Sequence, residues 1–226
     1  MKDLNKKAFG GLFFLLLVMA ALLFLPSWTL NYWQAWAFLA VFGASALAIT
    51  LYLMKRDPKL LERRVYGGPT AEKETSQKII QSITSLGFIA MLIVPALDHR
   101  FHWWPAVPFF AAVAGDVLVA IGFLIIFVVY KENTFTSATI EVYPEQKVVS
   151  SGLYALVRHP MYMGGLVMFV GMILSLGSWW GLLAFLLMMP AFIWRIFEEE
   201  GFLLKNLPGY AKYKNTVRYR LVPFIW

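Results

Sequence analysis

The sequence contains an 18-residue stretch, Ala8–Leu25, without a single Asp, Glu, Lys or Arg. An apolar run of about 18 residues or more is long enough to cross the hydrocarbon core of a bilayer as a helix. The chain of 226 residues is 60% hydrophobic and only 15% charged, whereas soluble domains are about 45–50% apolar and about 25% charged. These features predict an integral membrane protein, and they exclude disordered, collagen-like and disulfide-scaffold chains.

Hydropathy predicts about six membrane-spanning helices. They cover Ala8–Leu25, Tyr32–Met54, Ile79–Leu97, Ala106–Tyr130, Met161–Leu176 and Trp179–Phe197. The last two spans are short and are separated only by Gly177-Ser178, which predicts a C-terminal helical hairpin. The expected fold class is therefore all-α: a polytopic membrane helical bundle that forms a single membrane-embedded domain over residues 1–226.

Basic residues are distributed unevenly over the predicted loops. Six spans place both termini and the second and fourth loops on one side, which receives every Lys and Arg except Arg100. Loops rich in Lys and Arg normally stay in the cytoplasm, so we expect a multi-pass protein with both termini cytoplasmic. A bacterial plasma membrane is the expected location, because no organelle signal is visible. The bias also explains the net charge of +7, so membrane lipids are expected partners and nucleic acid is not.

Two polar features of the N-terminal part remain without an assigned role. Asp116 falls near the middle of its span, where a carboxylate costs at least about 2.5–3.5 kcal/mol, so it should face the bundle interior and have a partner. The Lys55–Lys78 loop contains the predicted turn Gly67-Gly68-Pro69. We interpret this loop mainly as a solvated segment beside the lipid head groups, with a lid over a site as the alternative.

Metal chemistry is not expected in this chain. It contains no cysteine, and His99 and His102 beside Asp98 provide too few ligands for a convincing metal site.

The most informative segment surrounds Pro160. A proline without an N–H group suits the first turn of a helix, so Arg158 and His159 are expected at a helix entrance on the cytoplasmic surface. Free backbone N–H groups and the positive end of the helix dipole at such a position favour an anionic or polar ligand group. Taken alone, the same segment is better explained as an interfacial helix cap.

A second charged group follows the sixth predicted span. Arg195 and Glu199 are four residues apart and should share one helix face, either as a simple ion pair or as ligand-binding groups. The three consecutive glutamates 198–200 cover roughly 200° of a helix, so at least one should point inward. Both charged segments are expected at the same cytoplasmic rim, which suits a zwitterionic ligand.

Taken in order, these residues resemble the isoprenylcysteine carboxyl methyltransferase family, which is related to membrane phospholipid methyltransferases. The pattern is Gln146…Gly152-x-Tyr154-x-x-x-Arg158-His159-Pro160-x-Tyr162-x-Gly164, then Arg195-x-x-x-Glu199-Glu200-x-x-Leu203, then Gly209-Tyr210-x-x-Tyr213. It lies within residues 133–226, and the ordered set is more specific than any single motif. The resemblance implies N-terminal spans over 1–129 and a methyltransferase-like catalytic region over 130–226, with S-adenosyl-L-methionine bound at the cytoplasmic face.

The resemblance also implies the site residues. Arg195 is the catalytic candidate, because it matches the family's acceptor-contacting arginine. The residues that would bind the cofactor are Gln146, Lys147, Val148, Val149, Tyr154, His159, Pro160, Met161, Tyr162, Glu199 and Glu200. No metal ligand is implied. Residues 217–223 form a longer ending than the family's usual Arg-Val-Pro.

The expected reaction moves a methyl group from the sulfonium of the cofactor to a lipophilic small-molecule or lipidated acceptor. A carboxylate acceptor is considered because it is already anionic at neutral pH and needs no general base. Two alternatives remain: an NADPH-dependent sterol or enone reductase of similar architecture, and a non-enzymatic membrane transporter that uses Asp116. Three consecutive glutamates disfavour NADPH phosphates, and polar residues concentrated at one rim disfavour the transporter.

Overall fold

The computed structural model describes every residue except Met1, Tyr66, Pro69, Lys73 and Ala106. The described residues form helices and no strand, which confirms the expected all-α class. The helices are α1 (Lys2–Ser27), α2 (Trp33–Arg56), α3 (Pro58–Val65), α4 (Thr75–Phe101), α5 (Phe109–Glu132), α6 (Pro160–Ser175), α7 (Gly181–Asn206) and α8 (Tyr210–Thr216), with a 3-10 turn at Gly152–Ala155. The predicted start of the fourth span at Ala106 and the proline of the predicted Gly-Gly-Pro turn lie outside the described residues.

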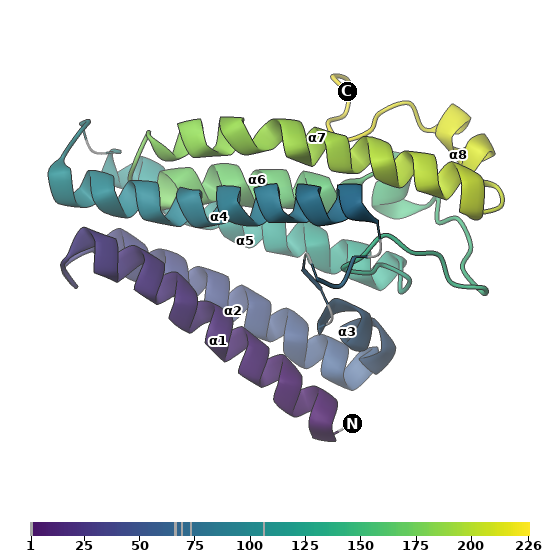
Figure 1. The fold of residues 1–226 in the computed structure, drawn as a ribbon, viewed down its shortest axis with the longest axis horizontal. Helices are drawn as coiled ribbons and strands as arrows, with labels where there is room; N and C mark the ends of the chain where they lie inside the picture. The colour runs from purple at the N-terminus through teal and green to yellow at the C-terminus, as the bar shows by residue number, and fades with distance from the viewer. Residues whose placement is uncertain (1, 66, 69, 73, 106) are drawn as a thin grey trace.

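Five of these helices, α1, α2, α4, α5 and α7, are long and apolar enough to cross a membrane. The fifth predicted span corresponds to α6, which has only 16 residues and is therefore roughly 24 Å long, against a hydrocarbon core of about 30 Å. The helix α7 continues to Asn206, well past the predicted end at Phe197. The helix α7 extends past the start of α6 toward the end of the bundle that carries α8 (Figure 1).

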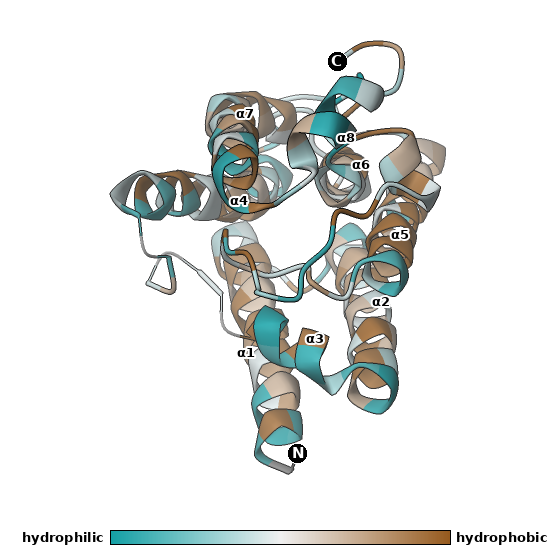
Figure 2. Cartoon of the chain, turned by 90° about the vertical axis from the view of Figure 1, so that its right-hand side faces the viewer, coloured by the Kyte–Doolittle hydropathy of each residue, from teal (hydrophilic) through white to brown (hydrophobic). Residues whose placement is uncertain are grey.

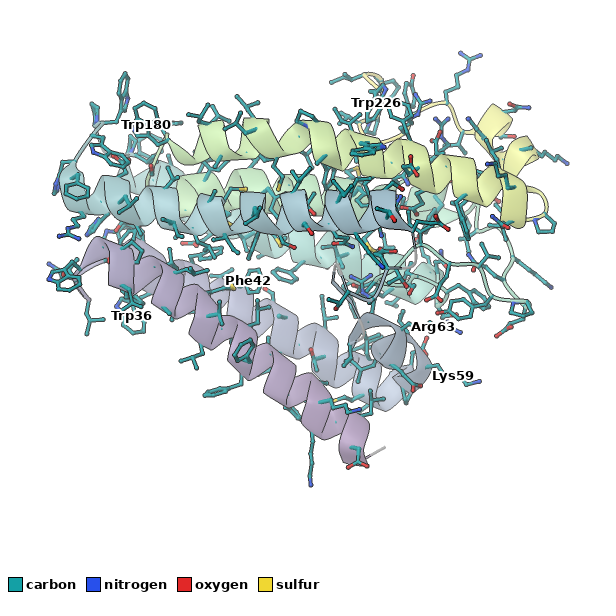
Figure 3. The ribbon with its side chains drawn as sticks, viewed as in Figure 1. Trp36, Phe42, Lys59, Arg63, Trp180 and Trp226 are labelled. Atoms are coloured by element: carbon teal, nitrogen blue, oxygen red, sulfur yellow. The ribbon has the colours of Figure 1, made fainter. Side chains whose placement is uncertain are left out.

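The long helices lie along a common direction, with α1 and α2 tilted as a pair against α4–α7 (Figure 1). Both chain ends, α3 and α8 lie toward one end of the bundle, and Figure 2 looks onto this end, where hydrophilic residues gather. We call it the basic end, because it also carries the loop 131–159 and side chains such as Lys59 and Arg63 (Figure 3). Trp36 and Trp180 lie at the opposite end, as expected of aromatic residues at a membrane interface.

Glycines bring α5 and α6 into very close contact. A Cβ atom at Gly115 would lie 2.6 Å from the carbonyl oxygen of Gly171, and a Cβ atom at Gly122 would lie 2.7 Å from that of Gly164. Small residues allow helices to approach closely in a membrane, where packing rather than hydrophobicity drives association. The helix α6 therefore packs mainly on α5, whereas α7 packs mainly on α4. The predicted hairpin connection is present, but its two helices contact each other through long side chains such as Phe169 and Phe192 and approach less closely than α5 and α6 do.

The intramembrane aspartate has the interior partner that was predicted. Ser175 of α6 donates a hydrogen bond to Asp116 of α5. A second aspartate, Asp98 near the end of α4, accepts a hydrogen bond of 2.6 Å from Ser178 in the α6–α7 connection. These contacts join helices in the half of the bundle away from the basic end.

The described part of the segment 55–78 includes a helix and is not simply a solvated loop. Its helix α3 packs against the loop that follows α5. Arg63 Nη1 donates to the carbonyl oxygen of Thr134 at 2.6 Å, and Arg64 Nη1 donates to that of Ser137 at 2.7 Å. These bonds attach the N-terminal part of the chain to the loop that forms one wall of the site.

Candidate functional site

A cavity of about 440 Å³ lies at the basic end between α4, α6, α7 and the loop 133–149. Its volume falls within the range of about 300–1,000 Å³ that is typical of small-molecule sites. Polar and aromatic side chains line the part near the helix ends. Farther into the bundle, the lining becomes mainly apolar with Ile80, Phe169, Met188 and Phe192. The cavity therefore combines a polar part at the basic end with an apolar part at membrane depth.

The structure brings the sequence-predicted site residues together around this cavity, with one exception. The residues that line it are Gln146, Lys147, Val148, Val149, Tyr154, His159, Pro160, Met161, Tyr162, Arg195 and Glu199. Glu200 is not part of the lining. The residues come from three separate segments, namely the loop after α5, the start of α6 and the end of α7.

The entrance to α6 lies where the sequence places it, but it is not on the surface. Pro160 is the first helical residue and His159 is the N-cap, yet Arg158 and His159 are only 7% and 4% exposed. Their backbone N–H groups donate to the carbonyl oxygens of Tyr219 and Arg220, both at 2.9 Å. The expectation of free N–H groups at a solvated surface is therefore wrong for these two residues, because the long C-terminal ending folds back over them.

Glu200 is the acidic residue that holds this covered entrance in place. Its carboxylate is almost completely buried and accepts a bond of 2.7 Å from Arg158 Nε. His159 lies 3.4 Å away, and Lys214 and Arg220 approach at 3.5 and 3.3 Å. Since all of these partners are protein groups and the residue is absent from the cavity lining, Glu200 joins α6 and α7 to the C-terminal segment. It confirms that one of the three glutamates points inward.

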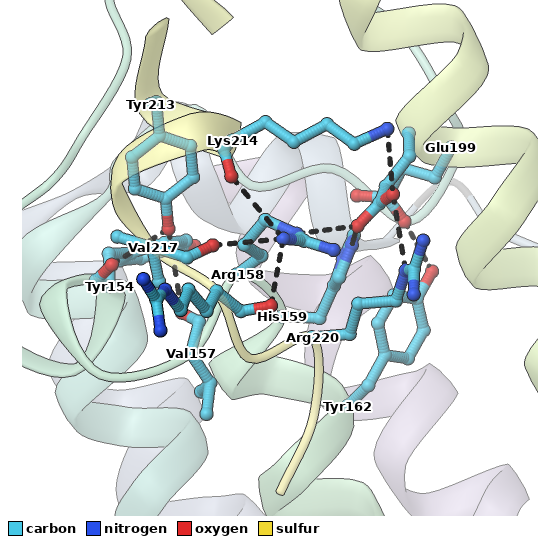
Figure 4. Close-up of polar contacts among 12 residues, drawn as sticks. Tyr154, Val157, Arg158, His159, Tyr162, Glu199, Tyr213, Lys214, Val217 and Arg220 are labelled. Atoms are coloured by element: carbon cyan, nitrogen blue, oxygen red, sulfur yellow. Dashed lines mark hydrogen bonds and ion pairs between the residues drawn. The ribbon is translucent and has the colours of Figure 1, made fainter. Parts of the chain in front are cut away.

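Glu199 has a different environment from its neighbour. It is half-buried, lines the cavity, and accepts a hydrogen bond of 2.6 Å from the hydroxyl group of Tyr162 on α6 (Figure 4). The ring of Tyr162 is itself held edge-on against Phe192 of α7, with the ring centroids 5.2 Å apart. Among the described residues, its hydrogen-bond donor is the neutral Tyr162, and Arg195 interacts with it electrostatically. This carboxylate is thereby fixed at the cavity wall, where a ligand can reach it.

Arg195 does not form the simple ion pair with Glu199 that the spacing allowed. Its Nη2 atom lies 2.7 Å from Oε1 of Glu72, and its Nη1 atom donates to Oε1 of Gln77. Glu72 and Gln77 are buried, at 5% and 4% exposure. The interpretation of the 55–78 segment as a solvated loop is therefore wrong for Glu72, because this carboxylate balances a buried guanidinium group on α7.

Tyr210 is a cavity residue whose role could not be assigned from its motif. Its side chain is 4% exposed, and its hydroxyl oxygen has no hydrogen-bond partner among the described residues. Burial, with the nearby Glu200 and Glu199, raises the pKa of this phenol, so it remains a donor at neutral pH. A buried donor without a partner is unusual, and this one lines the cavity.

Several other lining residues were not assigned to the site from the sequence. Some of them belong to a recognisable motif and others do not. Asn133 donates from Nδ2 to the Tyr154 hydroxyl group at 3.1 Å, and Tyr213 donates to the Tyr154 carbonyl oxygen at 2.8 Å. Tyr213 belongs to the Gly-Tyr-x-x-Tyr motif, which was a usable signal. Ile80 and Thr84 of α4 line the cavity from outside the motif-bearing half of the chain, and only the packing of α4 on α7 brings them there.

Comparison with known proteins agrees with this geometry. Residues 110–208 match the family model described as phospholipid methyltransferase. No curated protein matches the chain. The matched segment runs from the first turn of α5 to the end of α7 and contains the loop 133–149, the entrance to α6, Arg195 and Glu199. Residues 110–208 of this integral membrane protein therefore match the domain of the phospholipid methyltransferase family, which includes the isoprenylcysteine carboxyl methyltransferases.

Proposed function

We propose that the protein is an S-adenosyl-L-methionine-dependent methyltransferase that acts on a lipophilic acceptor. The two-part cavity is the observation that carries this proposal. Its polar part lies at the basic end, where a water-soluble cofactor has access, and its apolar part lies among α4, α6 and α7, where an acceptor from the bilayer would be accommodated. A catalytic region within residues 130–226, completed by α4, forms one domain with the N-terminal spans.

The residues of the polar part fit such a cofactor. S-adenosylmethionine supplies a methyl group attached to a positively charged sulfur. Glu199 provides a carboxylate to balance positive charge, and the Tyr210 hydroxyl group provides a buried donor without a protein partner. We assign cofactor contacts to these two residues and to the predicted lining residues of 146–149, 154 and 159–162. Glu200 is assigned a positioning role instead, because its partners are the surrounding protein cations.

Arg195 lies at the boundary between the two parts. It is buried, it lines the cavity, and its guanidinium plane is fixed by Glu72 and Gln77. We assign it to the acceptor, where its N–H groups would orient the nucleophilic group for in-line attack. Orientation and exclusion of water can contribute about 7–11 kcal/mol in favourable cases. The apolar wall formed by Phe169, Met188 and Phe192 would keep water from the reacting groups.

The orientation in the membrane follows from the same arrangement. With the basic end in the cytoplasm, both termini and the cofactor-binding part would face the compartment in which S-adenosylmethionine is made. We therefore propose a multi-pass protein of the bacterial plasma membrane with cytoplasmic termini.

Thermal stabilisation of the detergent-purified full chain tests the proposal. S-adenosylhomocysteine at about 100 times its Kd should stabilise the folded protein by about 2.7 kcal/mol, and NADPH should leave the melting temperature unchanged. The Glu199→Gln variant should require a higher S-adenosylhomocysteine concentration for the same shift, whereas Glu198→Gln serves as the matched control. Stabilisation by NADPH alone would support the reductase and overturn the proposal, and stabilisation by neither ligand would contradict both enzyme assignments.

Transfer itself provides the second test. Methyl-labelled S-adenosylmethionine is incubated with membranes that contain the protein, and label is measured in the organic and aqueous extracts. Label that appears mainly in the organic extract, and depends on Arg195, supports a lipophilic acceptor. Label confined to the aqueous extract contradicts it.

A further inference from the structure

The ion pair between Glu72 and Arg195 brings a negative charge to the acceptor end of the cavity. Both side chains are more than nine-tenths buried, and Oε1 of Glu72 lies 2.7 Å from Nη2 of Arg195. The same oxygen accepts a bond of 3.4 Å from Nε2 of Gln81. Arg195 and Gln81 line the cavity, whereas Glu72 does not. The carboxylate therefore contacts the guanidinium group from outside the cavity.

The partner of Arg195 comes from outside the family segment. Glu72 and Gln77 lie upstream of residue 110, where the family match begins, and they flank the start of α4 at Thr75. Arg195 belongs to the matched segment. The charge environment of this arginine is thus set in part by the N-terminal part of the chain, beside Tyr162 and Glu199 of the matched segment.

A buried guanidinium group that already has a carboxylate partner is a poor site for a second carboxylate. Two carboxylates at one cation in a desolvated site repel each other, and like charges placed together in an interface cost several kcal/mol. A carboxylate acceptor bound at Arg195 would create this arrangement. A neutral polar group would not, because it accepts a hydrogen bond without adding charge.

Arg195 still has donors to offer such a group. A guanidinium carries five N–H donors, and Glu72 and Gln77 each accept from one of the two terminal nitrogen atoms. Tyr162 also interacts with the guanidinium group, and the remaining N–H groups are sufficient for a carbonyl, amide or hydroxyl oxygen. With its charge balanced, the arginine acts in orientation more than in attraction of anions.

We propose that Glu72 is a specificity-determining residue, whose carboxylate neutralises Arg195 and makes the acceptor end of the cavity select against acidic head groups. The inference rests on the proposed function, because it takes Arg195 as the acceptor-contacting residue. It also narrows that function, since the carboxylate acceptor considered from the sequence is disfavoured while Glu72 is in place.

The experiment compares two probes of equal chain length, dodecanoate and dodecanamide, with the full-length protein in lipid nanodiscs. Binding is measured by calorimetry at about pH 8, where the free carboxylic acid is ionised, with protein-free discs used to subtract partitioning into lipid. Wild-type protein should bind dodecanamide at least as tightly as dodecanoate. The Glu72→Gln variant should bind dodecanoate at least about tenfold more tightly than wild type, with dodecanamide affinity changed by less than about twofold.

Glu74→Gln is the matched control, because Glu74 is exposed and lies two residues away; neither affinity should change. Unchanged dodecanoate affinity in Glu72→Gln, or an equal change for both probes, overturns the proposal. Should Glu72→Gln fail to fold, the wild-type measurement decides alone: dodecanoate bound at least about tenfold more tightly than dodecanamide contradicts selection against acids. Stabilisation by S-adenosylhomocysteine, measured on the same samples, separates failure of this inference from failure of the methyltransferase assignment.

Discussion

Two buried arginine–glutamate pairs lie at the basic end, and they share the same separation of 2.7 Å. In the first, Arg158 of the α6 entrance contacts Glu200 of α7, and its Nη1 atom also donates to the carbonyl oxygens of Val217 and Arg218 at 2.9 and 3.0 Å. The second pair joins Arg195 to Glu72, with Gln77 as a further acceptor. The first pair is thus tied to the backbone of the C-terminal segment, whereas the second is held by side chains.

We interpret the Arg158–Glu200 pair as a structural connection and the Arg195–Glu72 pair as part of the candidate site. A buried ion pair on its own is weak evidence for stability, because desolvation offsets much of the attraction. The Arg158–Glu200 pair has additional donors and acceptors on both partners, and Glu200 is excluded from the cavity lining. In both pairs the arginine lines the cavity and the glutamate does not, but among the described residues Arg195 is held by side chains alone. Variants of the two pairs should therefore fail in different ways.

Removal of Arg158 should have the largest effect. The Arg158→Ala variant leaves Glu200 buried and strips a donor from the backbone carbonyl oxygens of Val217 and Arg218. Breaking a buried pair from one side costs about 3–5 kcal/mol, so we expect a large loss of melting temperature and of monodisperse protein in detergent. Arg218→Ala, at an exposed side chain in the same segment, is the control. Normal stability of Arg158→Ala would contradict the structural role.

The contrast between the pairs also shows how far the sequence could be read. The helix entrance at Pro160 and the inward glutamate among residues 198–200 follow from local rules, because each depends on the geometry of a single helix. The burial of Arg158 could not be predicted, since it depends on a segment more than fifty residues away that returns over it. Glu72 lies in a polar loop whose composition indicates solvent, and only its pairing with Arg195 removes it from water.

The close packing of α6 on α5 rather than on α7 was missed for another reason, although a signal was present. A connection of a few residues normally joins antiparallel neighbours, so a packed hairpin was the natural prediction. Gly115 and Gly122 on α5, and Gly164 and Gly171 on α6, each lie seven residues apart and mark the faces that meet. Spacing of this kind can be read from a sequence, but the choice of partner helix cannot, because several spans carry small residues.

The second prediction concerns Arg195 itself. The Arg195→Lys variant keeps the positive charge beside Glu72 but loses the planar fork that orients an acceptor. Because a misplacement of about 1 Å can lower a rate by about a hundredfold, we expect turnover to fall by about this factor. Affinity for S-adenosylhomocysteine should stay within about twofold of wild type, since Arg195 is assigned to the acceptor. Arg220→Lys, outside the cavity lining, should retain most of the turnover.

Adjacent glutamates offer the third test, with an intermediate effect on affinity. Glu199→Gln keeps the size of the side chain and removes the charge, so cofactor affinity should fall by about tenfold, as for loss of a hydrogen bond to a charged group. Its melting temperature without ligand should change little, because the side chain is half-buried with Tyr162 as its partner. Glu200→Gln should behave in the opposite way, with lower stability and nearly normal affinity. The same pattern of losses in both variants would show that Glu199 and Glu200 do not have separate roles in cofactor binding and in stability.

The smallest effect is expected at Tyr210. The Gly-Tyr-x-x-Tyr motif contains two tyrosines, and only one of their hydroxyl groups has a protein partner among the described residues. Tyr213 donates its hydroxyl hydrogen to the Tyr154 carbonyl oxygen at 2.8 Å, whereas the buried Tyr210 hydroxyl group has no partner among the described residues. Tyr210→Phe removes a polar group that is costly to bury unpaired, so the ligand-free protein should melt at an equal or higher temperature. Its affinity for S-adenosylhomocysteine should fall by about two- to tenfold, as for loss of one neutral hydrogen bond.

Tyr213→Phe should instead lower the ligand-free melting temperature, so melting curves with and without ligand distinguish the two hydroxyl groups. A lower ligand-free melting temperature for Tyr210→Phe, together with unchanged ligand affinity, would place its hydroxyl group with the structural contacts and remove it from the site.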